Sequence, residues 1–213
     1  MKYTYVIWDF NGTIMDDVEI GIESVNVLLR KRGLATLSNK SEYQKVFGFP
    51  IYEYYKRLGF DFEKESYEDV AVEWVKEYTD REAGANTVKG VCEMLSFFKS
   101  RGVKQVIISA CEKNMLLRNA KNLRVAEYFD EILGIDDIYA SSKLDIALEW
   151  KKTHEDEKLL FIGDTDHDYS VAKAIGADCV LVAEGHQAYQ SLKSFAEGAF
   201  VLERMVDIKK IVA

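Results

Sequence analysis

Residues 5–17 read YVIWDFNGTIMDD, and this stretch decides the fold that the sequence predicts. The apolar run before Asp9 is typical of a buried strand, because a strand covered on both faces does not alternate polar and apolar side chains. The Asn11-Gly12 step after it indicates a tight turn. An aspartate at this place is either a turn residue or a reactive carboxylate displayed at the edge of a sheet.

Further apolar runs follow along the chain, and segments with helical spacing lie between the later ones. The runs cover residues 103–109, 131–133, 158–162, 179–182 and 199–202. Val91, Leu95 and Phe98 are an example of the helical spacing. Alternation of continuous apolar strands with helices predicts the α/β class, with a doubly wound parallel sheet of Rossmann-like form covered by helices on both faces.

The segment after the first strand does not follow this alternation. Val18, Ile22, Val25 and Leu29 share one helical face, and Gly33 suits the position just after a helix end. Further helices are expected at residues 41–47, 52–58 and 67–83. A crossover between parallel strands needs far fewer than these roughly 70 residues. We therefore expect residues 1–15 and 87–213 to form an α/β core and residues 16–86 to form a helical cap.

Composition excludes several classes of protein. The chain has 213 residues and a net charge of −8, which argues against a nucleic-acid or anionic-membrane surface. No apolar run approaches the roughly 20 residues of a membrane span, and no signal peptide is evident. The three cysteines are widely spaced, as expected for reduced thiols. We expect a cytoplasmic protein, and the sequence does not indicate its oligomeric state.

Polar residues follow the predicted strands at the edge where parallel α/β sheets bind ligands. Together they offer carboxylates for a hard cation such as Mg²⁺, and a hydroxyl, a lysine and backbone N–H groups for a phosphoryl group. These residues are Asp9, Ser109-Ala110, Lys143 in the loop Ser141-Ser142-Lys143, and Asp164 and Asp168 in the loop GDTDHD at 163–168.

The order and spacing of these residues resemble a known family. DFNGT at 9–13, Ser109, Lys143 and the Gly163-Asp164 to Asp168 segment are similar to the four motifs of the haloacid dehalogenase-like superfamily. The helical insert resembles the cap of its phosphoglycolate phosphatase and β-phosphoglucomutase branch. The resemblance implies a Mg²⁺-dependent phosphatase that acts on a small phosphorylated metabolite through an aspartyl-phosphate. The dehydrogenase motif G-x-G-x-x-G and the nucleotide-binding motif G-x-x-x-x-G-K-[ST] are both absent from the chain.

The resemblance also assigns the nucleophile and the metal ligands. It implies that Asp9 attacks phosphorus and that Mg²⁺ is held by the Asp9 side chain, the main-chain carbonyl of Asn11 and Asp164. Lys143 would neutralise the nucleophile and the phosphate oxygens. Asp168 would orient Lys143 or metal-bound water.

The same resemblance assigns the phosphate contacts. Ser109, the N–H of Ala110 and the N–H of Gly12 would hold the phosphoryl group, and Thr13 would brace the first loop. Taken alone, Ser109 is more often the N-cap of a helix, although a cap also lies where anions bind. A lone lysine at Lys143 is more often solvated, and it is the motif context that favours a functional role.

Asn11 departs from the family pattern, which usually has a second aspartate there to exchange protons with the leaving group and with water. An amide cannot do this, and losing a general acid–base typically costs on the order of 10²–10⁴ in rate. Several alternatives stay open: a good leaving group such as an acyl phosphate, a substitute acid perhaps from the cap, a slow phosphatase, a phosphotransferase or mutase, or a protein that only binds a phosphorylated ligand. Leu144 stands where the family often has proline, a smaller departure.

Other polar residues near these motifs carry weaker expectations. Asp166 and His167 are expected to be ordinary loop residues, and His186 is a candidate for the pocket edge. Asp16-Asp17 are expected to start the first cap helix, where acids favour the positive end of the helix dipole. Substrate contacts are candidates at residues 47–50, although a plain helix connection fits there equally well.

Overall fold

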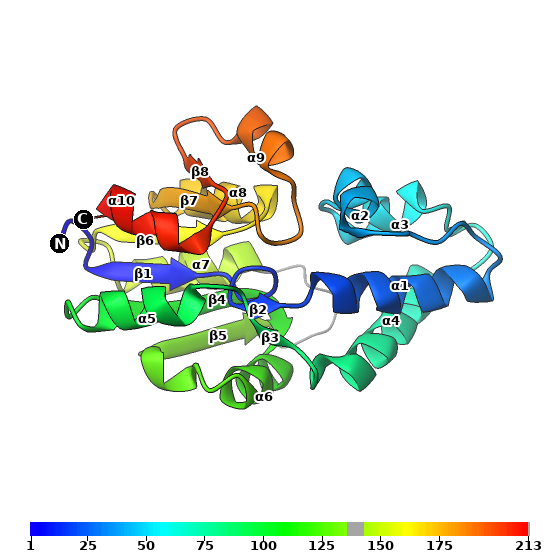
Figure 1. Cartoon of the computed structure of the whole chain (residues 1–213), viewed down its shortest axis with the longest axis horizontal. Helices are drawn as coiled ribbons and strands as arrows, with labels where there is room; N and C mark the ends of the chain where they lie inside the picture. The colour runs from blue at the N-terminus through cyan, green and yellow to red at the C-terminus, as the bar shows by residue number, and fades with distance from the viewer. Residues whose placement is uncertain (136–142, 213) are drawn as a thin grey trace.

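The computed structural model describes residues 1–135 and 143–212. A parallel sheet of six strands has the order β5-β4-β1-β6-β7-β8 (Figure 1). The strands are β1 (Tyr5–Trp8), β4 (Lys104–Glu112), β5 (Glu131–Ile135), β6 (Leu159–Gly163), β7 (Asp178–Val182) and β8 (Phe200–Leu202). Each predicted apolar run lies on one of these strands, and the predicted doubly wound α/β fold is confirmed.

Strand β1 lies in the middle of this sheet, between β4 and β6, and all four of its residues are buried. Val6 and Trp8 belong to the apolar core on one face, and Tyr5 and Ile7 belong to the core on the other. The strand therefore has no solvent face, which explains why its sequence is a continuous apolar run.

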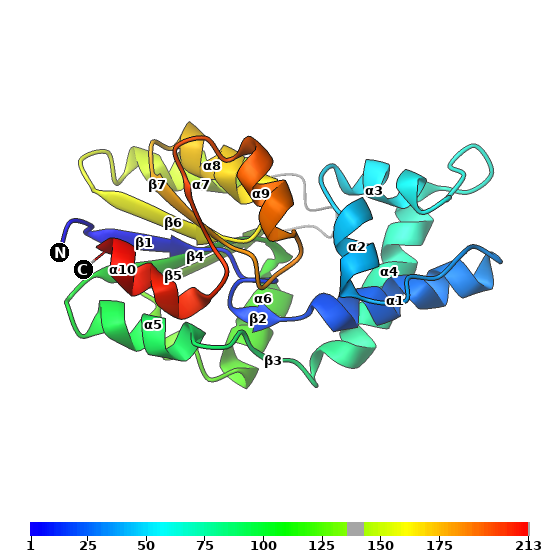
Figure 2. The ribbon, with the colours of Figure 1, turned by 45° about the horizontal axis from the view of Figure 1, so that its top comes forward.

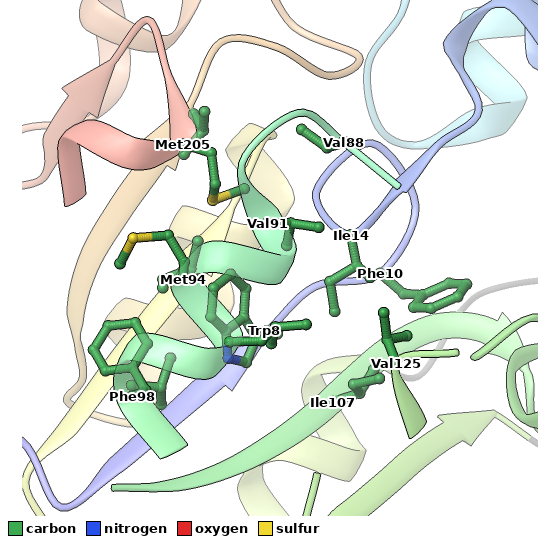
Figure 3. Packing of buried hydrophobic residues seen from close by; sticks show 14 of the residues in the cluster. Trp8, Phe10, Ile14, Val88, Val91, Met94, Phe98, Ile107, Val125 and Met205 are labelled. Atoms are coloured by element: carbon green, nitrogen blue, oxygen red, sulfur yellow. The ribbon is translucent and has the colours of Figure 1, made fainter. Parts of the chain in front are cut away.

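Helices cover both faces of the sheet. The Trp8 face packs against α5 (Val91–Lys99), α6 (Lys113–Asn122), η2 (Met205–Ile208) and α10 (Lys209–Val212), with η1 (Ala126–Tyr128) at its border. Figure 3 shows this face, where the Trp8 ring lies edge-on to Phe98 with centroids 6.0 Å apart. The opposite face packs against α7 (Lys143–Lys152), α8 (Asp166–Ala174) and α9 (Tyr189–Phe195).

Four further helices lie beyond the carboxyl end of β1 (Figures 1 and 2). The chain leaves the sheet through β2 (Met15–Asp16) and returns through β3 (Asn86–Thr87), and these two short strands pair antiparallel. Between them lie α1 (Val18–Lys31), α2 (Lys40–Val46), α3 (Ile51–Arg57) and α4 (Tyr67–Glu82). The sequence predicted the four helices but missed the two-residue strands, which are too short to show a period.

Helix α1 follows the predicted pattern. Val18, Ile22, Val25 and Leu29 are all buried in the apolar cluster that the four helices share. Gly33 follows the end of α1 with φ +66°, the left-handed conformation expected of a glycine at that position.

None of the described helices is both long enough and apolar enough to cross a membrane.

Candidate active site

The register of β1 and β6 brings two carboxylates together. Trp8 pairs with Ile162, and the Asp9 N–H donates to the Ile162 carbonyl at 2.9 Å, so Asp9 and Asp164 follow neighbouring strands. One carboxylate oxygen each from Asp9, Asp164 and Asp168 lie within 4.8 Å of one another, and all three residues are buried. The structure thus gathers the three acids that the sequence analysis selected.

Lys143 joins this group from the first turn of α7. Its Nζ donates to Asp9 Oδ1 and, at 2.5 Å, to Asp168 Oδ1. The side chain is only 2% exposed. Burial alone would lower the pKa of Lys143, but the charges of Asp168 and Asp9 outweigh it and raise the pKa above its ordinary value. The preceding Ser141 and Ser142 lie outside the described residues.

Asp168 is held in place by its other oxygen. Its Oδ2 accepts from the Asp164 N–H at 3.1 Å, the Thr165 N–H at 3.0 Å and the Thr165 hydroxyl at 2.7 Å. Thr165 and Asp168 thereby form the capping box that starts α8. Burial would raise the pKa of Asp168, but the Lys143 charge and these hydrogen bonds hold it below its usual value. The Asp168 carboxylate is therefore fixed on one side by α8 and on the other bonds the Lys143 ammonium.

Asp164 is enclosed by two loops. Its Oδ1 accepts from the Thr13 hydroxyl at 2.9 Å, and its Oδ2 accepts from the His186 N–H at 2.6 Å. A Cβ added at Gly12 or at Gly185 would come closer than 3.0 Å to this carboxylate. Burial raises the pKa of Asp164 to about 6, with His186 opposing the rise and Asp168 adding to it. Thr13 thus lies where a brace for the first loop was expected.

The acidic group has the chemistry of a divalent-cation site. Burial raises the pKa of Asp9 well above its usual value, the Asp168 charge adds to the rise, and Lys143 opposes it. A cation beside Asp9 and Asp164 would favour their ionised forms, and carboxylate oxygens are the ligands that Mg²⁺ prefers. Asp168 is less suited to be a ligand, because Lys143 and Thr165 already engage its oxygens.

Ser109 and Ala110 lie on β4 and line the same pocket as Asp9. The strand continues past the predicted end at Ser109 and reaches Glu112. The Ser109 hydroxyl oxygen accepts from the Cys111 N–H at 3.1 Å, and it is Glu112 that caps α6. The alternative that Ser109 is a helix N-cap is therefore wrong.

The N–H of Gly12 differs from its expected role. It donates to Asp17 Oδ1 at 2.8 Å and to the Met15 carbonyl at 2.9 Å. An N–H that is already shared between two acceptors is not directed at a phosphoryl group. The expectation that Gly12 would help to hold phosphate is corrected accordingly: here the N–H fixes the loop, whose φ of +75° at Gly12 suits glycine.

Asp17 is the site residue that the sequence analysis did not recognise. It precedes α1 as expected, but its side chain makes no capping hydrogen bond. Instead its Oδ2 accepts from Asn11 Nδ2 at 2.8 Å and from the Tyr78 hydroxyl at 2.7 Å. Asn11 Nδ2 also lies 2.8 Å from the Tyr78 hydroxyl oxygen. Because Tyr78 is more than 60 residues along the chain, no local pattern could have indicated this contact.

The two uncertain histidines both reach the pocket wall. His186 Nε2 lies 3.3 Å from Asp17 Oδ1, and its Nδ1 lies 2.7 Å from the Tyr43 hydroxyl. Burial alone would lower the pKa of His186, but the Asp17 carboxylate outweighs it and raises the pKa to about 9. His167 packs against the Phe49 ring with centroids 4.5 Å apart, and burial lowers its pKa.

A cavity of about 210 Å³ lies between these polar groups and the helices α1–α4. Asp9, Asn11, Ser109 and Lys143 line it on the sheet side. Aromatic side chains from the segment between α2 and α4 line it on the other, and Phe47 and Phe49 of the candidate contact stretch are among them.

Known proteins resemble this chain over most or all of its length. A relative named as a putative pyrophosphatase, PpaX from Caldanaerobacter subterraneus, is 26% identical over 218 residues, covering 100% of this chain and 96% of the relative. A phosphoglycolate phosphatase from Pseudomonas fluorescens is 23% identical over 189 residues, covering 85% of this chain and 70% of the relative.

A solved structure and a family model lead to the same family as these relatives. A solved haloacid dehalogenase-like family protein from Streptococcus pneumoniae superposes with a TM-score of 0.83 at 18% identity, covering 100% of this chain and 99% of the other. The family model described as haloacid dehalogenase-like hydrolase matches residues 6–182. The chain therefore belongs to the haloacid dehalogenase-like hydrolase family, in its phosphoglycolate phosphatase and β-phosphoglucomutase-like branch, as its motifs predicted.

Proposed function

We propose that this protein is a Mg²⁺-dependent phosphatase that hydrolyses a small phosphate monoester with Asp9 as nucleophile. The observation that carries the proposal is the buried Asp9 carboxylate, bonded to Lys143 and grouped with Asp164 at the carboxyl edge of the sheet. Membership of a hydrolase family with relatives named as phosphatases supports the reaction class.

The reaction proceeds in two steps. An Asp9 oxygen attacks phosphorus, the bond from phosphorus to the ester oxygen breaks, and that oxygen leaves with the bonding electrons. Water then attacks the aspartyl-phosphate, releasing inorganic phosphate and restoring Asp9. Lys143, held by Asp168, offsets negative charge on the nucleophile and the phosphoryl oxygens throughout. Mg²⁺ held by Asp9, Asp164 and the Asn11 carbonyl would supply further charge neutralisation.

Asn11 limits the help that position 11 can give to the leaving group. Its Nδ2 is bonded to Asp17 and Tyr78, and an amide does not exchange a proton at neutral pH. The ester oxygen must therefore leave without a proton from this position. This favours substrates whose leaving group is stable as an anion. It also keeps open a rival function on the same site, which is binding of a phosphorylated ligand without turnover.

Residues 16–86 are proposed to act as the cap of this site. Three contacts join α2 to the loop that follows β7: Lys40 Nζ to the Glu184 carbonyl at 2.5 Å, Gln44 Nε2 to the Gly185 carbonyl at 2.9 Å, and Tyr43 to His186. Opening for substrate entry would have to break these contacts, so we expect cap motion to gate turnover.

Phosphate release across a broad panel tests the proposal. The panel comprises sugar phosphates, nucleotides, phosphoglycolate, acyl phosphates and aryl phosphates, each with and without Mg²⁺. We expect at least one substrate to be turned over with Mg²⁺, and Asp9→Asn to lower that rate at least about 10³-fold. Asp166→Asn is the matched control, because Asp166 pairs with Gln187 and does not line the cavity. Equal activity of Asp9→Asn and the wild type would refute the nucleophile, and tight phosphate binding without turnover would favour the rival function.

A further inference from the structure

The wall of the cavity that faces the reacting groups is largely aromatic. It includes Phe47, Phe49, Tyr54, Trp74, Val75 and Tyr78. The rings of Trp74 and Tyr78 stack with centroids 4.8 Å apart, and the ring centroids of Phe47 and Tyr54 are 5.2 Å apart. Such a wall recognises an apolar, planar group by contact area and ring packing.

The cavity has no spare positive charge. Lys143 is its one lysine among the described residues, no described arginine lines it, and both Asp9 and Asp168 already engage Lys143. His186 is paired with Asp17 at 3.3 Å. Residues 136–142, which directly precede Lys143 in the sequence, read DDIYASS and contain no lysine or arginine.

A substrate with a second anionic group would therefore lose hydration without gaining a partner. Burying an unpaired carboxylate or phosphate is costly, and the acids Asp17 and Glu112 in the same wall would repel it. The relatives named for phosphoglycolate and pyrophosphate act on substrates of that doubly anionic kind. The described lining of this cavity offers no unpaired cation for such a second anionic group.

The amide at position 11 is an independent indication of the substrate, because it bears on the leaving group. Without a proton from this position, an alkoxide would leave slowly. A phenolate is a far better leaving group, since the phenol of tyrosine already ionises near pH 10 in water.

Building on the proposed phosphatase function, we propose that the substrate is an aryl phosphate, whose uncharged aromatic group lies against Phe49, Trp74 and Tyr78. The cavity of about 210 Å³ has room for such a ring. For comparison, an apolar cavity of roughly 150 Å³ accepts benzene. The phosphoryl group lies at Asp9 and Lys143, and the reaction releases a phenol and inorganic phosphate.

Four substrates test the two parts of the proposal separately: phenyl phosphate, benzyl phosphate, phosphoglycolate and pyrophosphate. We expect kcat/KM for phenyl phosphate to exceed that for the two doubly anionic substrates about 10²-fold or more. Benzyl phosphate carries the same ring on a poor leaving group. It is expected to have a KM close to that of phenyl phosphate, well below that of phosphoglycolate, with a lower kcat.

A charge added to the wall gives a second, independent measurement. Val75→Lys places an ammonium on the cavity wall, and the half-buried position leaves room for the stem of the new side chain. We expect the ratio of kcat/KM for phosphoglycolate to that for phenyl phosphate to rise about tenfold. Val72→Lys is the matched control on the same helix, because Val72 is 52% exposed and does not line the cavity; its ratio should stay that of the wild type.

The outcomes separate this inference from the proposed function. Preference for phosphoglycolate or pyrophosphate, or equal kcat for benzyl and phenyl phosphate, overturns the aryl assignment while leaving the phosphatase standing. A ratio unchanged by Val75→Lys refutes the role of the missing charge; if that variant does not fold, the four wild-type measurements still decide. Phosphate release from none of these substrates, nor from the broader panel, refutes the phosphatase itself and this inference with it.

Discussion

The amide of Asn11 is held by a buried network rather than left free at the pocket. Its Nδ2 donates to the Asp17 carboxylate, which also accepts from Gly12 and Tyr78. Burial would raise the pKa of Asp17, but the charge of His186 and these hydrogen bonds hold it below its usual value. Asp17, six residues after Asn11, thus organises the first loop through hydrogen bonds to Asn11, Gly12 and Tyr78.

Asn11→Asp tests what the amide does. The new carboxylate would lie about where Nδ2 now lies 2.8 Å from Asp17, and two carboxylates that close share one proton. The shared proton makes position 11 a competent acid, so we expect kcat for benzyl phosphate to rise about 10–100-fold, with a smaller change for phenyl phosphate. Steady-state kinetics on both substrates provide the measurement. Equal changes for the two would mean that proton transfer to the leaving group does not limit the rate.

At the scale of single elements, the backbone of Gly12 in the loop after β1 lies very close to the side chains of Asp164 and His186. A Cβ at Gly12 would collide with Asp164 and with the His186 ring, and the φ of +75° adds conformational strain. We expect Gly12→Ala to abolish activity and to lower the free energy of unfolding by about 2 kcal/mol or more. Activity assays and urea denaturation measure the two effects.

Gly176 provides the control for this change. It has nearly the same backbone conformation, with φ +71°, but a Cβ there would meet nothing within 4 Å. Gly176→Ala should therefore lower the free energy of unfolding only by the cost of the left-handed conformation, about 1–2 kcal/mol. The variant should keep full activity. Similar losses of activity in both variants would mean that backbone conformation, and not crowding of Asp164, makes Gly12 necessary.

The elements differ in how much of them the sequence could predict. Strands such as β1 and β6 are continuous apolar runs, and Asp9, Lys143, Asp164 and Asp168 follow from motif order, because these signals are local. The ribbon of β2 and β3 and the Asp17 network depend on pairing between segments about 60–70 residues apart. Neither pairing produces a periodic pattern or a distinctive composition in the local sequence. Neither could therefore be predicted from the sequence.

For the whole molecule, one short loop of the sheet domain receives several hydrogen bonds from α2. The loop of residues 184–186 is hydrogen-bonded to three side chains of α2, those of Lys40, Tyr43 and Gln44. His186 of this loop also contacts Asp17, just before α1. The same loop donates an N–H to Asp164. The loop of residues 184–186 therefore contacts both α2 and the acidic site.

The charge of His186 makes the contact between this loop and Asp17 depend on pH. The pKa of His186 is raised from 6.5 to about 9 in the folded protein, where the Asp17 carboxylate outweighs the effect of burial. Below pH 6.5 both the folded and the unfolded chain hold the proton, so the stabilisation is fully present. As the pH rises from 6.5 to about 9, only the folded chain keeps it, and the stabilisation is progressively lost.

Unfolding measured against pH tests this linkage on the complete chain. With EDTA present to keep cations from the acidic site, we expect the free energy of unfolding of the wild type to fall between pH 6.5 and 9. The fall should be roughly 3 kcal/mol, at about 1.4 kcal/mol for each pKa unit. His186→Gln keeps a polar side chain but cannot titrate, so its free energy of unfolding should change much less over the same range. A parallel decline in both proteins would show that other groups cause the pH dependence and that the Asp17–His186 pair does not stabilise the fold.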